Sequence, residues 1–133
     1  MTPDEVARRS AAAMWAGDQA SRSLGMELLD VTPGRATVRM TVREDMVNGH
    51  AIGHGGFTFT LADSAFAFAC NSYNRSTVAA GAEISFLRPT RLGDVLKSCS
   101  ALLGDRPVTA EDPDAVVVAP GSTVEFLPPF AGG

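Results

Sequence analysis

The chain has few cysteines, few basic residues and no basic cluster, and each shortage excludes a class of protein. Its two cysteines, Cys70 and Cys99, show neither metal-ligand spacing nor a disulfide framework, so we expect both to be small buried residues in a reducing compartment. The chain has 11 Lys and Arg residues against 15 Asp and Glu, for a net charge of −4. Because a nucleic-acid surface needs clustered positive charge, we expect no nucleic-acid partner.

Long hydrophobic runs are also lacking. No run approaches the length needed to span a bilayer, and the N-terminus is charged and helical in pattern, without the apolar core of a secretory signal. We therefore expect a cytoplasmic protein without a membrane partner. In contrast, 45% of the 133 residues are hydrophobic, which is enough for one core without disulfides or metals. We expect a single domain over residues 1–133.

The most informative stretch runs from Asn48 to Asn71. Its first part is polar and glycine-rich, and its second part, residues 57–71, is apolar and rich in alanine. The apolar part is too long for an ordinary strand, so we predict a helix that begins after the glycines. Apolar side chains cover more than half of its circumference, which predicts burial almost all round. The remaining polar strip consists of Thr60, Asp63, Ser64 and Asn71.

Capping and alternation patterns predict the elements before this helix. Residues 2–5, Thr-Pro-Asp-Glu, have the composition of a capping box, which predicts a helix that ends near Gly17. Residues 26–31 and 35–42 flank a Thr-Pro-Gly turn, as in an antiparallel hairpin with one face exposed to solvent. The inward residues of its second strand are Ala36, Val38, Met40 and Val42.

Further strands are predicted after the helix. One covers residues 77–87 and ends at Arg88-Pro89, and another runs from Asp94 to about Leu103. Two short strand-like pieces follow at residues 115–119 and 123–127. One mostly apolar helix with strands before and after it predicts an α+β arrangement, in which an antiparallel sheet wraps around the helix.

Asp63 and the glycines before the helix carry the candidate chemistry. A carboxylate among alanine and phenylalanine is costly to bury, so Asp63 either faces water or serves as a general base or nucleophile. Gly55 and Gly56 either form a simple turn or offer free N–H groups and the positive end of the helix dipole to a substrate carbonyl, as an oxyanion hole does.

The spacing of these residues constrains the site. Asp63 follows Gly55 by eight residues, which on a helix is a separation of about 12 Å along the axis. One carbonyl cannot contact both residues. If both act on the same thioester or ester, they must come from two helices that lie antiparallel across a homodimer interface.

Several nearby residues have two interpretations each. His50 and His54 have the spacing of metal ligands on a helix, but the surrounding glycines disfavour a helix and no third ligand is close in sequence, so we expect no metal. We instead expect His54 to orient the loop or the glycine peptide through hydrogen bonds. Asn48 either holds the attacking water or the substrate carbonyl, or serves the turn.

Arginines and phenylalanines offer candidate binding groups. Arg88 and Arg91 flank a proline at a predicted strand end, where they either bind phosphates or are simply solvated. Phe57, Phe59 and Phe86 either line a pocket for an apolar or aromatic acyl group or belong to the core.

Together these motifs resemble those of the hotdog-fold acyl-CoA thioesterases, specifically the phenylacetic acid degradation thioesterase family, which acts on hydroxyphenylacetyl-CoA and similar aryl or acyl thioesters. The resemblance covers roughly residues 10–102. The combination of an asparagine, His-Gly-Gly and Leu-Ala-Asp at fixed spacing is far more specific than any one of them. The matching segments are Met46-Val47-Asn48-Gly49-His50 through His54-Gly55-Gly56, Leu61-Ala62-Asp63-Ser64-Ala65-Phe66-Ala67, Cys70-Asn71-Ser72, Ile84-Ser85-Phe86-Leu87-Arg88-Pro89 and Gly93-Asp94.

The resemblance implies a hotdog fold and a homodimer or a dimer of dimers. It also implies hydrolysis of an acyl- or aryl-CoA thioester, with Asp63 as nucleophile or general base and the Gly55 N–H polarising the thioester carbonyl. Asn48 and His54 would orient the substrate and the loop. Members of the family need no metal or organic cofactor.

The resemblance further implies where the substrate lies. CoA would lie at the subunit boundary with its phosphates near Arg88 and Arg91. Apart from the resemblance, we expect Gly56, Phe57 and Phe86 to contact the substrate.

Two departures from the family leave a second function open. Relatives often carry a serine or threonine facing the aspartate where this chain has Ala79-Ala80. Relatives also continue past residue 102 with two long alternating strands, whereas residues 103–133 hold five of the eight prolines and one basic residue, Arg106. This atypical composition suggests a shifted reading frame or a divergent ending. The alternative is a non-catalytic protein that binds CoA esters; a hotdog dehydratase fits less well, because no His/Asp pair is placed as in those enzymes.

Overall fold

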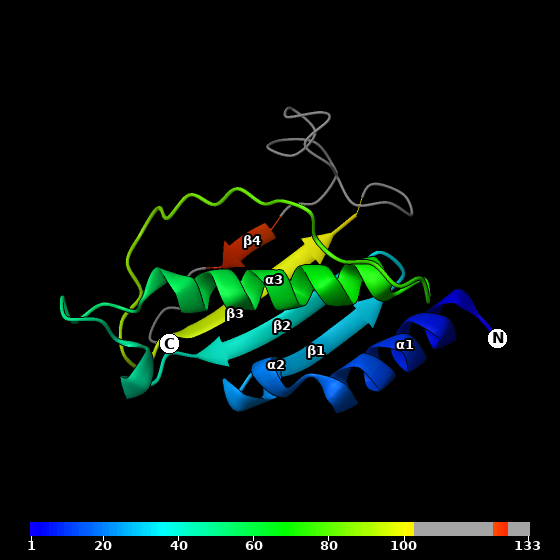
Figure 1. The fold of residues 1–133 in the computed structure, drawn as a ribbon, viewed down its shortest axis with the longest axis horizontal. Coiled ribbons are helices and arrows are strands. Elements are labelled where there is room, and N and C mark those ends of the chain that lie inside the picture. The colour runs from blue at the N-terminus through cyan, green and yellow to red at the C-terminus, as the bar shows by residue number, and fades with distance from the viewer. Residues whose placement is uncertain (103–123, 128–133) are drawn as a thin grey trace.

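An antiparallel sheet of four strands packs against one long helix in the part of the chain that the structure describes (Figure 1). The computed structural model describes residues 1–102 and the backbone of residues 124–127. The strands lie in the order β1-β2-β3-β4, which confirms the predicted α+β arrangement. In chain order the elements are α1 (Pro3–Gly17), α2 (Gln19–Ser23), β1 (Glu27–Thr32), β2 (Arg35–Thr41), the 3-10 helix η1 (Glu44–Met46), α3 (Gly55–Asn71), β3 (Val95–Ala101) and β4 (Val124–Leu127).

The first helix forms as its capping pattern predicts. Thr2 is the N-cap of α1, where its Oγ1 accepts the N–H of Glu5 at 3.2 Å and Glu5 Oε2 accepts the N–H of Thr2 at 2.6 Å. Pro3 occupies the first helical position, where a missing N–H costs no hydrogen bond. The helix packs beside β1 with Ala7 fully buried, so it covers one end of the core.

The predicted hairpin of β1 and β2 is confirmed. The two strands pair antiparallel, and Gly34 in their turn has a φ of 74°, a conformation that favours glycine. The alternation of β2 is also confirmed, because Ala36, Val38 and Met40 are at most 1% exposed. β2 therefore presents an apolar face to the helix above it.

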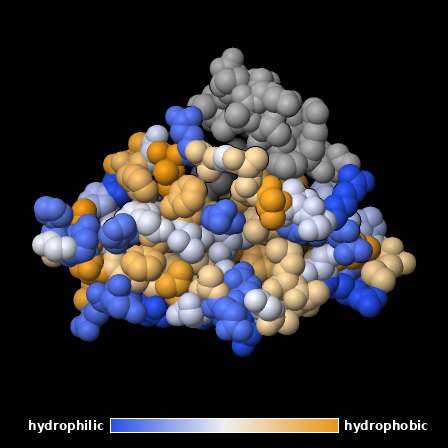
Figure 2. Space-filling view, in the orientation of Figure 1, coloured by the Kyte–Doolittle hydropathy of each residue, from blue (hydrophilic) through white to orange (hydrophobic). Residues whose placement is uncertain are grey.

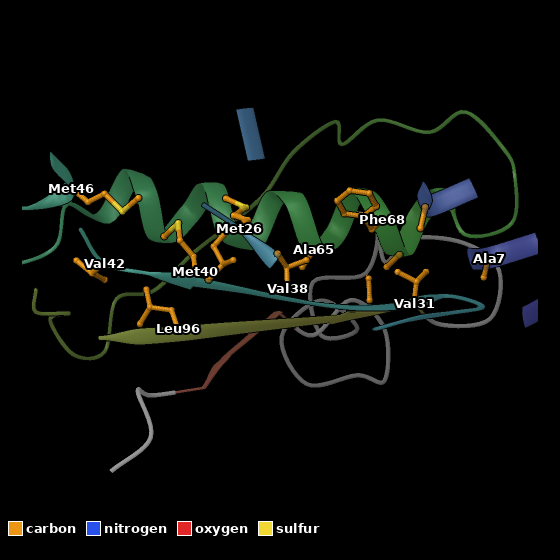
Figure 3. Close-up of a cluster of buried hydrophobic side chains, with 14 residues drawn as sticks. Ala7, Met26, Val31, Val38, Met40, Val42, Met46, Ala65, Phe68 and Leu96 are labelled. Atoms are coloured by element: carbon orange, nitrogen blue, oxygen red, sulfur yellow. The ribbon is translucent and has the colours of Figure 1, made fainter. Parts of the chain in front are cut away.

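The central helix α3 begins at Gly55, because His54 caps it and both glycines take helical positions. Its inward residues Leu61, Ala65 and Phe68 are at most 1% exposed and belong to the hydrophobic core, and the helix as a whole packs on β2 and β3. Figure 3 shows Ala65 and Phe68 in this core. Burial of a leucine or phenylalanine side chain contributes about 2 kcal/mol to folding. This packing fixes the helix, and hence its two ends, relative to the sheet.

The burial of α3 is less complete than its composition predicts. Gly56 and Asp63 are exposed, and two turns of helix separate them, so they share one open face. The predicted polar strip is also divided, because Ser64 is buried with its Oγ 2.7 Å from the Oγ of Ser21 on α2. Helical periodicity could not anticipate that α2 supplies a hydroxyl partner at this position.

The predicted strand over residues 77–87 is wrong. The segment has no regular structure and runs back along α3 towards the start of the helix (Figure 1). Its first residue, Thr77, is held at the end of α3, because the Asn71 side chain accepts the N–H of Thr77 and donates to its carbonyl. Alternating residues favour an extended backbone, but a strand also needs a hydrogen-bonded neighbour, which the described chain does not supply here. Val78 and Leu87 are consequently 88% and 90% exposed.

The later strands agree with prediction where the structure describes them. β3 falls within the predicted strand from Asp94 to about Leu103, and β4 falls within the predicted piece at residues 123–127. The piece predicted at residues 115–119 lies outside the described residues, so it and the single domain over residues 1–133 stay predictions. No helix among the described residues is long and apolar enough to cross a membrane.

Candidate active site at the start of the central helix

His54 builds the start of α3. Its Nδ1 accepts the N–H of Gly56 at 2.9 Å, and its own N–H donates to the carbonyl of Met46 at 2.7 Å. Both contacts hold the His54 side chain and backbone at the glycine peptide, and its part in the site stays a prediction. The Gly55 N–H, at the first helical position, donates to no acceptor in residues 1–102, which leaves it available at the positive end of the helix dipole.

Asn48 shapes the loop that leads to this helix. Its Oδ1 accepts the N–H of His50 at 2.9 Å and that of Ile52 at 3.4 Å, and its backbone N–H donates to the carbonyl of Ile52 at 2.8 Å. The side-chain oxygen thus serves the turn, which is one of the two roles that the sequence left open. The loop is not helical, as the glycines predict, and the described residues contain no group of three or more His, Cys, Asp or Glu that could hold a metal.

Residues 86–91 lie against this loop, and we call them the strap. Thr90 accepts the N–H of Gly53 at 2.8 Å through its carbonyl, and Arg91 Nη1 donates to the carbonyl of Ala51 at 3.5 Å. The strap brings Phe86 against Gly55 and places the exposed Arg91 beside the loop. Sequence reasoning missed the contact of Thr90 with Gly53. A glycine in a loop can indicate that another segment approaches it closely, but the sequence does not say which segment; only the fold shows that it is Thr90.

Asp63 is not brought to Gly55. Both residues lie on α3, eight positions apart, so the helix holds them about 12 Å apart along its axis. The Asp63 side chain is exposed on the face of α3 that carries Gly56, and in one chain it faces solvent. Within a single chain the acid and the free N–H are therefore too far apart to contact one carbonyl group.

Cys70 lies two turns beyond Asp63 on the same helix. It is 5% exposed, and burial raises the pKa of its thiol to about 11, with a further upward contribution from the Asp63 carboxylate. A thiol with this pKa is protonated at neutral pH, which agrees with the predicted role as a small buried residue. Cys99, predicted to be buried as well, is only half-buried.

We expect the stability of the protein to fall between pH 9 and 11 because of Cys70. The thiol of the unfolded chain ionises near its ordinary pKa of 9, whereas the folded thiol stays neutral until about 11, so in this window rising pH favours the unfolded state. Below pH 9 the residue contributes no pH dependence. The slope should reach at most about 1.4 kcal/mol per pH unit.

Urea unfolding at pH 8, 9, 10 and 11 measures this slope. Cys70→Ala should flatten the dependence, and Cys99→Ala, which changes the more exposed cysteine, is the control. An unchanged slope in Cys70→Ala would contradict the assignment.

A sheet packed on one long helix, with a capped glycine start and an exposed acid further along, defines a hotdog-fold protein. A family model described as the thioesterase superfamily matches residues 50–103. The solved structure of the Escherichia coli PaaI protein from the phenylacetic acid degradation operon superposes with a TM-score of 0.75 and 38% identity, covering 82% of this chain and 77% of that chain. The chain belongs to the thioesterase superfamily.

Other comparisons agree. The chain is 46% identical over 88 residues to the acyl-coenzyme A thioesterase PaaI of Escherichia coli, a match that spans 66% of this chain and 63% of that protein. A mutant of the phenylacetic acid degradation protein PaaI from Thermus thermophilus superposes with a TM-score of 0.63 and 32% identity, covering 70% of this chain and 77% of that chain. A Streptococcus mutans protein bound to acetyl-CoA superposes with a TM-score of 0.58 and 25% identity, covering 61% of this chain and 65% of that chain.

Proposed function

We propose that this protein is an acyl-CoA thioesterase that hydrolyses aryl- or acyl-CoA thioesters, of the hydroxyphenylacetyl-CoA kind, to the free acid and CoA. The observation that carries the proposal is the pair of half-sites on α3, a free Gly55 N–H at its start and an exposed Asp63 carboxylate further along. Each group has the chemistry that thioester hydrolysis needs, and neither is engaged within the described chain.

The reaction follows from the two groups. The Gly55 N–H donates to the thioester carbonyl and stabilises the negative charge that develops on its oxygen. Asp63 either removes a proton from the attacking water or attacks the carbonyl carbon itself, in which case water hydrolyses the resulting anhydride. In both routes the C–S bond breaks, the CoA thiolate leaves and takes up a proton, and the acyl group gains the hydroxyl of water.

The relatives support the choice of substrate. The Escherichia coli relative is named an acyl-coenzyme A thioesterase, and the Streptococcus mutans relative was crystallised with acetyl-CoA. In this chain, Arg88 and Arg91 of the strap are exposed near the start of α3 and are suited to the phosphates of CoA. Gly56, Phe57 and Phe86 lie at the same helix end and would line the acyl group, with Phe57 also packed against the hydrophobic core.

The proposal requires two chains, because the two half-sites lie too far apart in one. We infer a homodimer in which the exposed faces of two α3 helices lie antiparallel, so that Asp63 of each chain meets Gly55 of the other. This face of the molecule mixes hydrophobic and hydrophilic side chains over α3 (Figure 2). Residues 78–87 beside it are mostly exposed, and their backbone groups, which form no ladder with another described strand, could pair with a second copy.

Mixing two inactive variants tests the two-chain site. Asp63→Asn removes one half-site and Gly55→Pro the other, so each homodimer should keep at most about 1% of the wild-type activity. In a hybrid dimer, one of the two sites combines an intact Asp63 with an intact Gly55. After unfolding and refolding an equal mixture, we expect about a quarter of the wild-type activity, because about half of the dimers are hybrids with one working site.

The measurement is free-thiol release from phenylacetyl-, hydroxyphenylacetyl- and hexanoyl-CoA. Each variant refolded alone is the control for recovered activity. No recovery in the mixture, when a native gel shows hybrid dimers, would contradict the two-chain site. Tight binding of these esters by wild-type protein without thiol release would instead identify a non-catalytic CoA-ester-binding protein.

A further inference from the structure

Phe86 lies in the second half of the connection between α3 and β3, and its ring lies directly against Gly55 at the start of α3. A Cβ placed on Gly55 would lie 2.9 Å from Cζ and 3.0 Å from Cε1 of the Phe86 ring. The ring therefore occupies the space beside Gly55 that a side chain would fill in any other residue. Phe86 is nonetheless 58% exposed, so much of its surface is open beside the free N–H.

The strap fixes the position of this ring. The carbonyl of Thr90 accepts the N–H of Gly53 at 2.8 Å, and the N–H of Arg91 donates to Oδ2 of Asp94 at 2.8 Å. A Cβ on Gly53 would lie 1.9 Å from Oγ1 of Thr90, so this approach is open to glycine alone. The backbone bond between Gly53 and Thr90 thus ties the loop to the strap two residues before Gly55, and this tie keeps Phe86 near the helix start.

We propose that Phe86 is the specificity-determining residue of the site, and that it selects flat aromatic acyl groups over alkyl groups of similar length. The inference rests on the proposed function. A thioester carbonyl that accepts the Gly55 N–H has its acyl chain beside Gly55, where the open surface of Phe86 is the adjacent wall. An aromatic group can stack or pack edge-on against that ring, and this geometry favours it over an alkyl chain by about tenfold.

The ratio of kcat/KM for phenylacetyl-CoA to that for hexanoyl-CoA tests this role. Phe86→Ala should lower the ratio about tenfold, whereas Phe86→Tyr keeps an aromatic ring and should retain it. Leu92→Ala is the matched control, because Leu92 is 56% exposed in the same connection and lies outside the site. An unchanged ratio in Phe86→Ala, or an equal loss for both substrates, would overturn the proposal.

Failure of the proposed function would be seen separately. If wild-type protein releases no thiol from either ester, the hydrolase assignment is wrong. The preference for aromatic groups is then measured as a ratio of binding affinities. Calorimetric titration with S-phenylethyl-CoA and S-hexyl-CoA, which have a CH₂ in place of the carbonyl, should then show the ratio of affinities falling in Phe86→Ala and not in Leu92→Ala. Equal affinities of wild-type protein for both analogues would overturn the role of Phe86.

Discussion

Asp63→Asn is expected to lower kcat/KM for thioester hydrolysis by about a thousandfold, because positioned general bases and nucleophiles contribute factors of this order. The amide keeps the size of the side chain and removes the charge that would activate water or attack the carbonyl. Asp63 is exposed and has no hydrogen bond or ion pair with other described residues. We therefore expect the free energy of unfolding to change by less than about 0.5 kcal/mol.

The measurement is thiol release under kcat/KM conditions, with thermal unfolding of the same samples. Asp30→Asn is the matched control, since Asp30 is an exposed acid on β1, far in sequence from the candidate site. If Asp63→Asn loses activity and also unfolds at a clearly lower temperature than Asp30→Asn, the role of Asp63 is structural. Full activity in Asp63→Asn would exclude it as base or nucleophile and would remove one half of the proposed site.

Gly55→Pro is expected to lower kcat by about a hundredfold or more, whereas Gly55→Ala should lower it far less. Proline lacks the N–H that would stabilise the developing oxyanion, and loss of one such donor costs about 100- to 1,000-fold. Gly55 is the first residue of α3, a position at which proline fits the helix, and His54 before it is already extended, with φ −66° and ψ 127°. The substitution therefore removes the donor without breaking the helix.

Gly55→Ala controls for the added side chain. A Cβ in either variant meets the Phe86 ring at 2.9 Å, so both displace that ring equally, and the alanine variant still has the N–H. The difference in kcat between the two variants measures the contribution of the donor. Equal kcat values, with similar circular dichroism spectra, would show that the Gly55 N–H does not act on the substrate.

The local elements of the fold could be predicted because each depends on neighbouring residues in the chain. The capping box at Thr2 and Glu5 forms within one turn of helix, and the alternation of β2 reports directly which side chains face the core. Residues 77–87 show the limit of such patterns. Their alternation favours an extended backbone, but whether that backbone becomes a strand depends on a neighbouring strand, which sequence periodicity does not report.

The candidate site shows the same division. The chain order of Gly55 and Asp63, together with helix geometry, was enough to separate the acid from the free N–H. His54 as the helix cap and Asn48 as the support of the turn are likewise local contacts that their residue types favour.

The tertiary structure alone decided that Thr90 packs on Gly53 and that Phe86 covers Gly55. These residues lie more than thirty positions apart in the chain, and their contact arises from how the connection after α3 returns to the start of the helix. The sequence by itself determined which groups could act on a thioester and that one helix keeps them apart. The three-dimensional packing determined what surrounds each of them, because contacts between distant segments depend on the whole fold and leave no periodic signal in the chain.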